Sequence, residues 1–168
     1  MVNIKRWFRH LFTPPWAWRR AFPQVTLDAI EAAIAAGETT HGGEIRFVIK
    51  NSLPGILAWR GISGRERAIE MFSSLRVRDT EHNSGVLIYL LLADHDIEIV
   101  ADRGTAAQVV PAAWETVAQT TEAAFRQDDF ECGALEGIEA ISALLAQNFP
   151  PSGHNPDELA NRPIMLRR

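Results

Sequence analysis

A run of consecutive apolar residues followed by a partly alternating run constrains the fold of this chain more than any other feature. Gly85 precedes eight apolar residues, Val86 to Ala93, rich in β-branched and aromatic types, which predicts a strand buried on both faces. Residues 96–101 then alternate over much of their length, as expected of a strand with one partly wetted face. The dipeptide Asp94-His95 between the runs predicts a two-residue turn, although it lacks the glycine typical of such turns. Together these residues predict an antiparallel hairpin.

The predicted register of the hairpin brings two polar segments together. Pairing of Ala93 with Asp96 places Gly85 opposite Gly104. The polar residues just before the first strand therefore lie beside those just after the second. We expect functional side chains at this end of the hairpin.

The rest of the body is predicted to be mainly helical. Residues 51–61, with one proline and two glycines, are expected to form loops or short turns. The remaining predicted elements are a helix from an N-cap at Thr26 to a stop at Gly37, a strand over 45–49, a helix after the capping box Ser63-Gly-Arg-Glu66, a helix over 111–126 that begins at Pro111, and a helix over 133–147.

This order defines an α/β fold in a single compact domain, with a small mixed sheet flanked by helices. A strand–helix–strand connection from 45–49 to 86–93 should be parallel and right-handed, and the hairpin adds an antiparallel strand. Loops 41–44, 79–84 and 102–104 should then converge at one end of the sheet. We call this the three-loop end.

The three-loop end carries several hard oxygen ligands of the kind that calcium binds, six to eight at a time. The candidate ligands are Asp79, Glu81, Asn83, Asp102 and Glu44. Their spacing does not match an EF-hand, so a cation site would have to be assembled from separate loops, and calcium suits it better than magnesium. The alternative is a solvated acidic loop in which Asp79 or Ser84 caps backbone groups.

A hydrolytic mechanism is harder to assemble from these residues. His41, His82 and Arg103 offer an acid, a base and a phosphate clamp, although Arg103 is equally suited to pair with Asp79 or Asp102. Cys132 is not followed by an arginine-closed phosphate loop and is interpreted as a small packing residue. A non-enzymatic binding module is therefore favoured over a phosphomonoesterase that uses the same crevice.

Residues 1–22 form an N-terminal arm that differs from the body. Apolar residues at helical spacing are interleaved with cations, and Pro14-Pro15 ends the pattern. The residues assigned to a membrane or partner surface are Lys5, Arg6, Trp7, Phe8, Arg9, Leu11 and Phe12. One interpretation is an interfacial helix on an anionic leaflet. The other is an arm that packs on its own sheet or on a second copy of the chain, forming a homo-oligomer.

Charge and composition narrow the possible partners. Five of the 17 basic residues lie in the arm, which has no acid, so the remainder carries 12 basic against 21 acidic side chains. A body with this negative net charge would repel phosphate groups, which disfavours a nucleic-acid partner. One cysteine excludes an internal disulfide, and no apolar run is long enough to span a membrane. We expect a cytoplasmic protein, free or peripheral to the inner membrane, with a protein partner that is soluble or membrane-embedded and no organic cofactor.

Several ordered motifs resemble the TPM-domain family, also called the TPM phosphatase domain. They are Glu44-Ile-Arg-Phe-Val-Ile49, Asn83-Ser-Gly-Val-Leu-Ile88, Glu98-Ile-Val-Ala-Asp-Arg-Gly104 and the stretch from Phe125 to Gly137. The arm and Leu75-Arg-Val-Arg-Asp-Thr-Glu81 are similar to the cytoplasmic bacterial branch of that family.

The resemblance implies a compact α/β sandwich, here over residues 23–150. The cluster of Pro, Gly and Asn after Pro150 predicts a loosely ordered tail over 151–168. The resemblance also implies an acidic crevice that binds calcium in some members. A phosphatase activity has been proposed for some members, and others resemble assembly or scaffolding factors.

Overall fold

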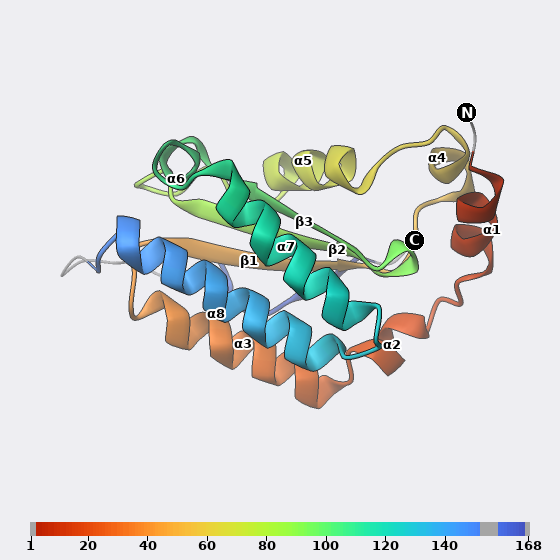
Figure 1. Ribbon diagram of the computed structural model, residues 1–168, viewed down its shortest axis with the longest axis horizontal. Coiled ribbons are helices and arrows are strands. Elements are labelled where there is room, and N and C mark those ends of the chain that lie inside the picture. Colours follow the sequence, from red (N-terminus) through yellow and green to blue (C-terminus); the bar gives the residue numbers. More distant parts are fainter. Residues whose placement is uncertain (1–2, 152–157, 167–168) are drawn as a thin grey trace.

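The computed structural model describes residues 3–151 and 158–166 and confirms the predicted fold class: one α/β domain with a four-stranded mixed sheet between layers of helices (Figure 1). The helices are α1 (Ile4–Phe12), α2 (Ala17–Ala21), α3 (Gln24–Glu38), α4 (Gly55–Trp59), α5 (Gly64–Ser74), α6 (Arg103–Gln108), α7 (Pro111–Phe125) and α8 (Phe130–Asn148), with a 3-10 turn η1 (Leu92–Asp94). The strands are β1 (Glu44–Lys50), β2 (Gly85–Leu91), β3 (Asp96–Ala101) and β4 (Ile164–Leu166).

The sheet has the order β3-β2-β1-β4. The parallel pairing of β1 with β2 confirms the predicted crossover, and β2 pairs antiparallel with β3. β4 was not predicted: three residues of the tail pair parallel with Val48, Ile49 and Lys50. This part of the tail is therefore joined to the sheet, contrary to expectation. Three residues are too short a run for periodicity to reveal. Residues 152–157 of the predicted tail lie outside the described residues.

The hairpin register differs from the prediction by two residues. β2 ends at Leu91, which pairs with Asp96, and the chain turns through η1 and a left-handed His95 with φ of 52°. The last two residues of the apolar run are buried in this turn instead of extending the strand, which composition alone cannot distinguish. A shift of two leaves every side chain on its predicted face. The polar segments still meet, because the Asp102 N–H donates to the Gly85 carbonyl at 2.9 Å.

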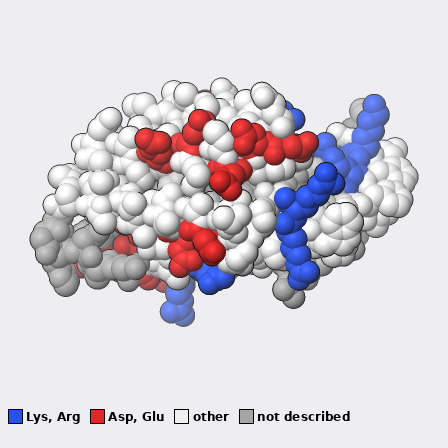
Figure 2. Space-filling view, turned by 90° about the horizontal axis from the view of Figure 1, so that it is seen from below, with Lys and Arg blue, Asp and Glu red and all other residues white. Residues whose placement is uncertain are grey.

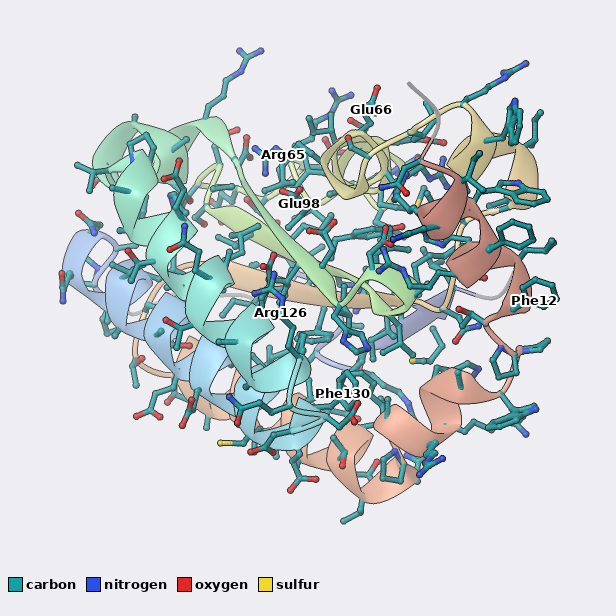
Figure 3. All side chains as sticks on the ribbon, turned by 45° about the vertical axis from the view of Figure 1, so that its right-hand side comes forward. Phe12, Arg65, Glu66, Glu98, Arg126 and Phe130 are labelled. Carbon is teal, nitrogen blue, oxygen red and sulfur yellow. The ribbon has the colours of Figure 1, made fainter. Side chains whose placement is uncertain are left out.

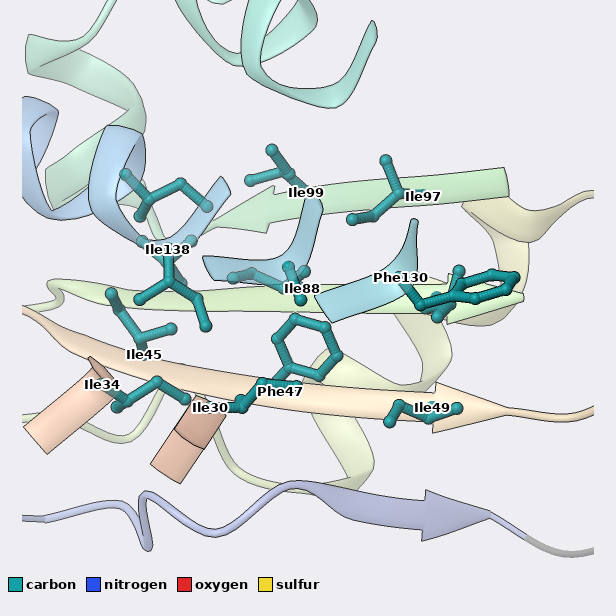
Figure 4. Close-up of a cluster of buried hydrophobic side chains, with 14 of the residues drawn as sticks. Ile30, Ile34, Ile45, Phe47, Ile49, Ile88, Ile97, Ile99, Phe130 and Ile138 are labelled. Atoms are coloured by element: carbon teal, nitrogen blue, oxygen red, sulfur yellow. The ribbon is translucent and has the colours of Figure 1, made fainter. Parts of the chain in front are cut away.

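β2 is buried along its whole length, as predicted, because both faces of the sheet are covered. α3, α7 and α8 pack on one face and α5 on the other. The larger core cluster lies on the first face and draws on β1, β2, β3, α3 and α8 (Figure 4). The smaller cluster on the opposite face includes Leu87, Tyr89 and Phe72. These two layers fix the strand ends in place.

Several local predictions need correction at the helix ends. α3 begins two residues before Thr26, whose buried hydroxyl instead donates to the Glu131 carboxylate, so Thr26 is no N-cap. Gly37 lies inside α3 and does not end it. A Cβ at Gly37 would lie 2.3 Å from the Ser142 Oγ, so the glycine permits close packing against α8. The capping box of Ser63 with Glu66 is confirmed.

Two further corrections concern the loop predicted over 51–61 and the first turn of α8. Part of the predicted loop 51–61 forms the short helix α4. α8 begins at Phe130, and its buried side includes Phe130, Gly133 and Ala134. This phase directs Cys132 away from the core, so the cysteine is exposed and not a packing residue.

Candidate functional site

The three predicted loops do converge at one end of the sheet. The Glu44 N–H donates to the Ser84 carbonyl at 3.3 Å, and the Ser84 hydroxyl donates to the Gly42 carbonyl at 3.0 Å. Gly104 completes the junction, because a Cβ there would lie 2.6 Å from the Asn83 carbonyl oxygen. The end of the sheet is thus a tightly packed meeting of backbone segments.

Two predicted ligands, Glu44 and Asp102, are buried at this end, with 2% and 6% exposure. The Glu44 Oε2 accepts a hydrogen bond from the Leu159 N–H at 3.0 Å, in the segment that leads to β4. The Asp102 Oδ1 accepts from the Arg103 N–H at 2.7 Å and caps α6. The Asp102 Oδ2 is buried without a hydrogen-bond partner among the described residues. Asp102 thus has an oxygen available to a further ligand.

The other three predicted ligands are exposed, in contrast to that pair. Asp79 forms an ion pair with Arg78 at 3.7 Å, and both side chains are more than half exposed. The Glu81 N–H donates to the Glu158 carboxylate at 3.0 Å, and Asn83 adopts a left-handed φ of 51°. In residues 3–151 and 158–166, no group of three or more His, Cys, Asp or Glu side chains is placed to hold a metal ion.

The residues predicted to act as acid, base and phosphate clamp differ in their burial. His41 is fully buried, with Nδ1 3.0 Å from the Gly43 carbonyl oxygen. Burial lowers the pKa of His41, although the hydrogen bond to Gly43 opposes the shift, so the ring is neutral at physiological pH. His82 and Arg103 are exposed, and Arg103 contacts Asp102 through its backbone N–H. A buried neutral imidazole and an exposed one do not form a shared acid–base pair.

The opposite end of the sheet holds the N-terminal arm through a buried carboxylate. Asp94, in the hairpin turn, accepts from Arg6 Nε at 2.8 Å and lies 3.0 Å from His10 Nε2. Arg9 also forms an ion pair with Asp94. The Leu53 N–H donates to His10 Nδ1 at 3.1 Å, so the ring proton is on Nε2 and is donated to Asp94. Three side chains of α1 therefore converge on one carboxylate.

The charge of Asp94 follows from these contacts. Burial would raise its pKa, but the hydrogen bonds from His10 and Arg6 and the positive charge of Arg6 outweigh burial and hold the pKa well below the usual carboxyl range. Asp94 is only 8% exposed and His10 is fully buried. The ionised carboxylate thus anchors α1 on the body.

Because the polar side of α1 faces the body, much of its apolar side faces solvent. Trp7 is partly buried and donates to the Gly55 carbonyl at 3.1 Å, with its ring 5.7 Å from that of Trp59. Figure 3 shows Phe12 on the outer side of α1, pointing away from the sheet. We define the apolar arm face as the exposed residues Ile4, Phe8, Leu11 and Phe12 of α1 with Ile56 and Trp59 of α4, between 41% and 72% exposed.

Exposed cations lie at the same end of the molecule as the apolar arm face. Figure 2 shows long basic side chains at the end of the molecule where α1 and α2 lie, while acidic side chains cross the middle of that view. The exposed basic residues of the arm and of α4's end are Lys5, Arg9, Arg19, Arg20 and Arg60. We call these five exposed basic residues the cationic rim. Among the described residues, no helix is both long enough and apolar enough to cross a membrane.

Sequence reasoning identified the arm but missed the residue that holds it. Asp94 was interpreted only as a turn residue, and no local pattern distinguishes a turn aspartate from one that receives three cationic or imidazole partners. Trp59 and Ile56 were placed in a loop, so the continuation of the apolar face into α4 was not predicted. The amphipathic spacing in α1 was the available signal for the face itself.

A mixed four-stranded sheet covered by helices on both faces, with loops converging at one end, defines an α/β sandwich of the TPM type. The TPM domain profile matches residues 20–144, and the chain belongs to this family.

Solved structures support the same fold. The BA42 protein from the psychrophilic bacterium Bizionia argentinensis is 30% identical, with a TM-score of 0.74, over 83% of this chain and 92% of that one. The N-terminal domain of a protein from P. gingivalis is 15% identical, with a TM-score of 0.61, over 84% of this chain and 95% of that one, and it supports the fold alone. The comparison with curated proteins found no match.

Proposed function

We propose that this TPM-domain protein is a non-enzymatic docking module that binds anionic membrane surfaces through the apolar arm face. The observation that carries the proposal is the orientation of α1: its charged side is fixed to Asp94, and Phe8, Leu11 and Phe12 point outward. A helix that buries its polar side on its own domain needs another apolar environment for the opposite side.

Energetics favour reversible binding. Burial of a large apolar side chain contributes roughly 1.5–3 kcal/mol when complete, and each cation near an anionic leaflet contributes about 1 kcal/mol. The side chains of the apolar arm face are already partly covered, so each contributes only a fraction of that range. The ion pairs to Asp94 hold α1 in its helical conformation before binding, which lowers the entropic cost of docking.

Charge argues against a second copy of the chain as the occupant. Residues 1–22 carry five basic side chains and no acid, so two arms packed face to face would bring like charges together. An anionic lipid surface accepts the aromatic residues and the cationic rim at once. It would also hold the body beside a membrane-embedded partner at the inner face.

Vesicle flotation tests the proposal. Full-length protein should float with vesicles of phosphatidylcholine and phosphatidylglycerol but not with phosphatidylcholine alone. The double variant Phe8→Ser/Phe12→Ser should lose flotation, while Val110→Ser, an equally exposed apolar site before α7, should keep it. A chain that stays unbound with anionic vesicles and sediments as a dimer would assign the face to self-association instead.

We further propose a calcium site at the three-loop end, supported by the buried Asp102 Oδ2 that lacks a hydrogen-bond partner among the described residues. Loop carbonyls beside Gly104 are additional hard oxygens, and Glu44 is buried at the same end of the sheet. Asp79, Glu81 and Asn83 are exposed in this structure, so they would have to move toward Asp102 to join the site.

Calorimetric titration with Ca²⁺ should give heat that Asp102→Asn removes and Asp28→Ala, an exposed aspartate in α3, does not. No heat at millimolar Ca²⁺ would exclude the site. Release of phosphate from an aryl phosphate that is lost in Asp102→Asn would instead favour the phosphomonoesterase.

A further inference from the structure

The sheet has a second feature that neither membrane docking nor the three-loop end uses: a groove along its outer edge. Among the described residues, β3 is a terminal strand of the sheet and pairs only with β2. Beside it lies a cavity of about 440 Å³ whose lining includes Arg65 of α5, Ile99 of β3 and Trp114 of α7. In Figure 3, Arg65 and Glu98 lie next to each other between α5 and β3. The groove thus runs between the two helical layers along an open strand.

Polar side chains contact the outer backbone groups of β3. The Arg65 Nη1 donates to the Ile99 carbonyl at 2.6 Å, and the Ile97 N–H donates to the Glu122 carboxylate at 3.4 Å. These contacts establish that residues 97 and 99 direct their backbone groups away from β2, as alternation requires. The Arg65 side chain is half exposed, so it can move aside for another hydrogen-bond donor.

The two sides of the groove differ in character. Ile99 belongs to the core cluster that Trp114 packs against, so the side toward α7 is apolar. Glu98 points to the opposite side, 3.5 Å from Arg65, and Asp96 lies on the same side two residues away. Burial raises the pKa of Asp96, and repulsion from Glu122 adds to the shift. Burial also raises the pKa of Glu98, with repulsion from Asp96 adding to it and Arg65 opposing it. Both acids would therefore gain from a further positive charge. Glu115 adds a further acid to the groove's lining.

The opposite edge of the sheet shows that an extended segment fits this architecture. There β4 pairs with β1 over three residues and covers the edge with the chain's own C-terminal segment. The β3 edge has no such strand among the described residues.

We propose that the β3 edge binds an extended peptide segment of another protein, in which basic and apolar residues alternate. Its backbone replaces the Arg65 and Glu122 side chains at residues 99 and 97 and adds a strand to the sheet. Its apolar side chains enter the groove between Ile99 and Trp114, and its basic side chains face Glu98 and Asp96. A second copy of β3 is a poor occupant, because antiparallel self-pairing would place these acids close together.

Fluorescence anisotropy with synthetic peptides tests this inference without lipid. The probe is a labelled eight-residue peptide of alternating Lys and Val. It should bind at least tenfold more tightly than an alternating Glu and Val peptide, and more tightly than a Lys and Val peptide with Pro at one inner position. Amide exchange over residues 96–101 should slow when the probe binds. Equal binding of the Pro-containing peptide would reduce the effect to general charge attraction and overturn the proposal.

Two variants with opposite expected effects on peptide affinity make the test sharper. Glu98→Lys should weaken binding at least tenfold, whereas Glu139→Lys, an exposed acid on α8, should leave it unchanged. Arg65→Met removes the side chain that occupies the Ile99 carbonyl and should tighten binding by about threefold to tenfold. Weaker binding by Arg65→Met would overturn the assignment of the strand edge. Phe8→Ser/Phe12→Ser should bind the probe normally, which separates this site from the membrane surface.

Discussion

The two ends of the sheet both contain buried carboxylates, but they satisfy them in different ways. At the arm end, Asp94 receives Arg6, Arg9 and His10 from a helix more than 80 residues away in sequence. At the three-loop end, Asp102 and Glu44 accept hydrogen bonds from backbone N–H groups. Asp94 therefore depends on α1 remaining docked on the body, whereas Asp102 and Glu44 are bound by backbone N–H groups of neighbouring segments.

The difference explains why the two ends present different surfaces. At the arm end, Arg6, Arg9 and His10 of α1 contact Asp94, so the apolar side of the helix faces solvent. At the three-loop end, the backbone is packed tightly enough that Gly104 has no room for a side chain. The first end therefore presents an exposed apolar surface, and the second presents closely packed backbone around two buried carboxylates.

Asp94→Ala tests the arm end most strongly. Removing the carboxylate leaves the fully buried His10 and the largely buried Arg6 without their partner, so we expect a loss of about 3–5 kcal/mol in the free energy of unfolding, measured with urea. Asp79→Ala removes an ion pair of exposed side chains and should cost less than about 1 kcal/mol. Equal losses in both variants would contradict the anchoring role of Asp94.

Lowering the pH should destabilise the wild-type chain through protonation of Asp94. The folded-state pKa of Asp94 lies below its unfolded value of about 4, so its stabilisation is present above that pH and is lost as pH falls toward the folded value. The difference in unfolding free energy between wild type and Asp94→Asn should therefore be largest near neutrality and shrink below about pH 4. A difference that stays constant with pH would mean that Asp94 is not the titrating group.

Gly104→Ala tests the packing of the three-loop end. Its Cβ would press on the carbonyl oxygens of Asn83 and His82, both backbone atoms, at a cost of about 1–3 kcal/mol. The matched change at the arm end is Gly55→Ala, whose Cβ would meet only Trp7 Nε1 at 3.7 Å and should cost nothing measurable. Thermal melts of both variants compare the two ends directly.

Asp102→Ala should cost about 1 kcal/mol, the usual value of a lost N-cap, because only its Oδ1 accepts a hydrogen bond among the described residues. The loss is expected to be smaller than that for Asp94→Ala although both side chains are similarly buried. Urea unfolding of the two variants under identical conditions measures the contrast, and the reverse order would show that backbone partners matter more than charged ones here.

Phe12→Ser should change stability least, by less than about 0.5 kcal/mol, because the side chain is 72% exposed. Its effect should appear in vesicle flotation instead. A clear drop in melting temperature would show that Phe12 supports the fold and is not held ready for a partner.

The sequence alone determined most of the architecture. The apolar run that begins at Val86, the capping box at Ser63 and Pro111 at the start of α7 each act over a few residues, so their elements were predicted correctly. The strand–helix–strand order predicts a parallel crossover, and β1 and β2 do pair in parallel. This pairing brings the three loops to one end of the sheet.

Tertiary structure decided what each end of the sheet became. Whether Leu92 and Ala93 extend a strand or fill a turn depends on packing against distant segments, and the same holds for Thr26, which is a buried donor to Glu131 and not a cap. The orientation of α1 was fixed by the position of Asp94, because an amphipathic helix can bury either side and a buried carboxylate strongly favours cations. Periodicity identifies the two faces of such a helix, but only the fold determines which one faces solvent.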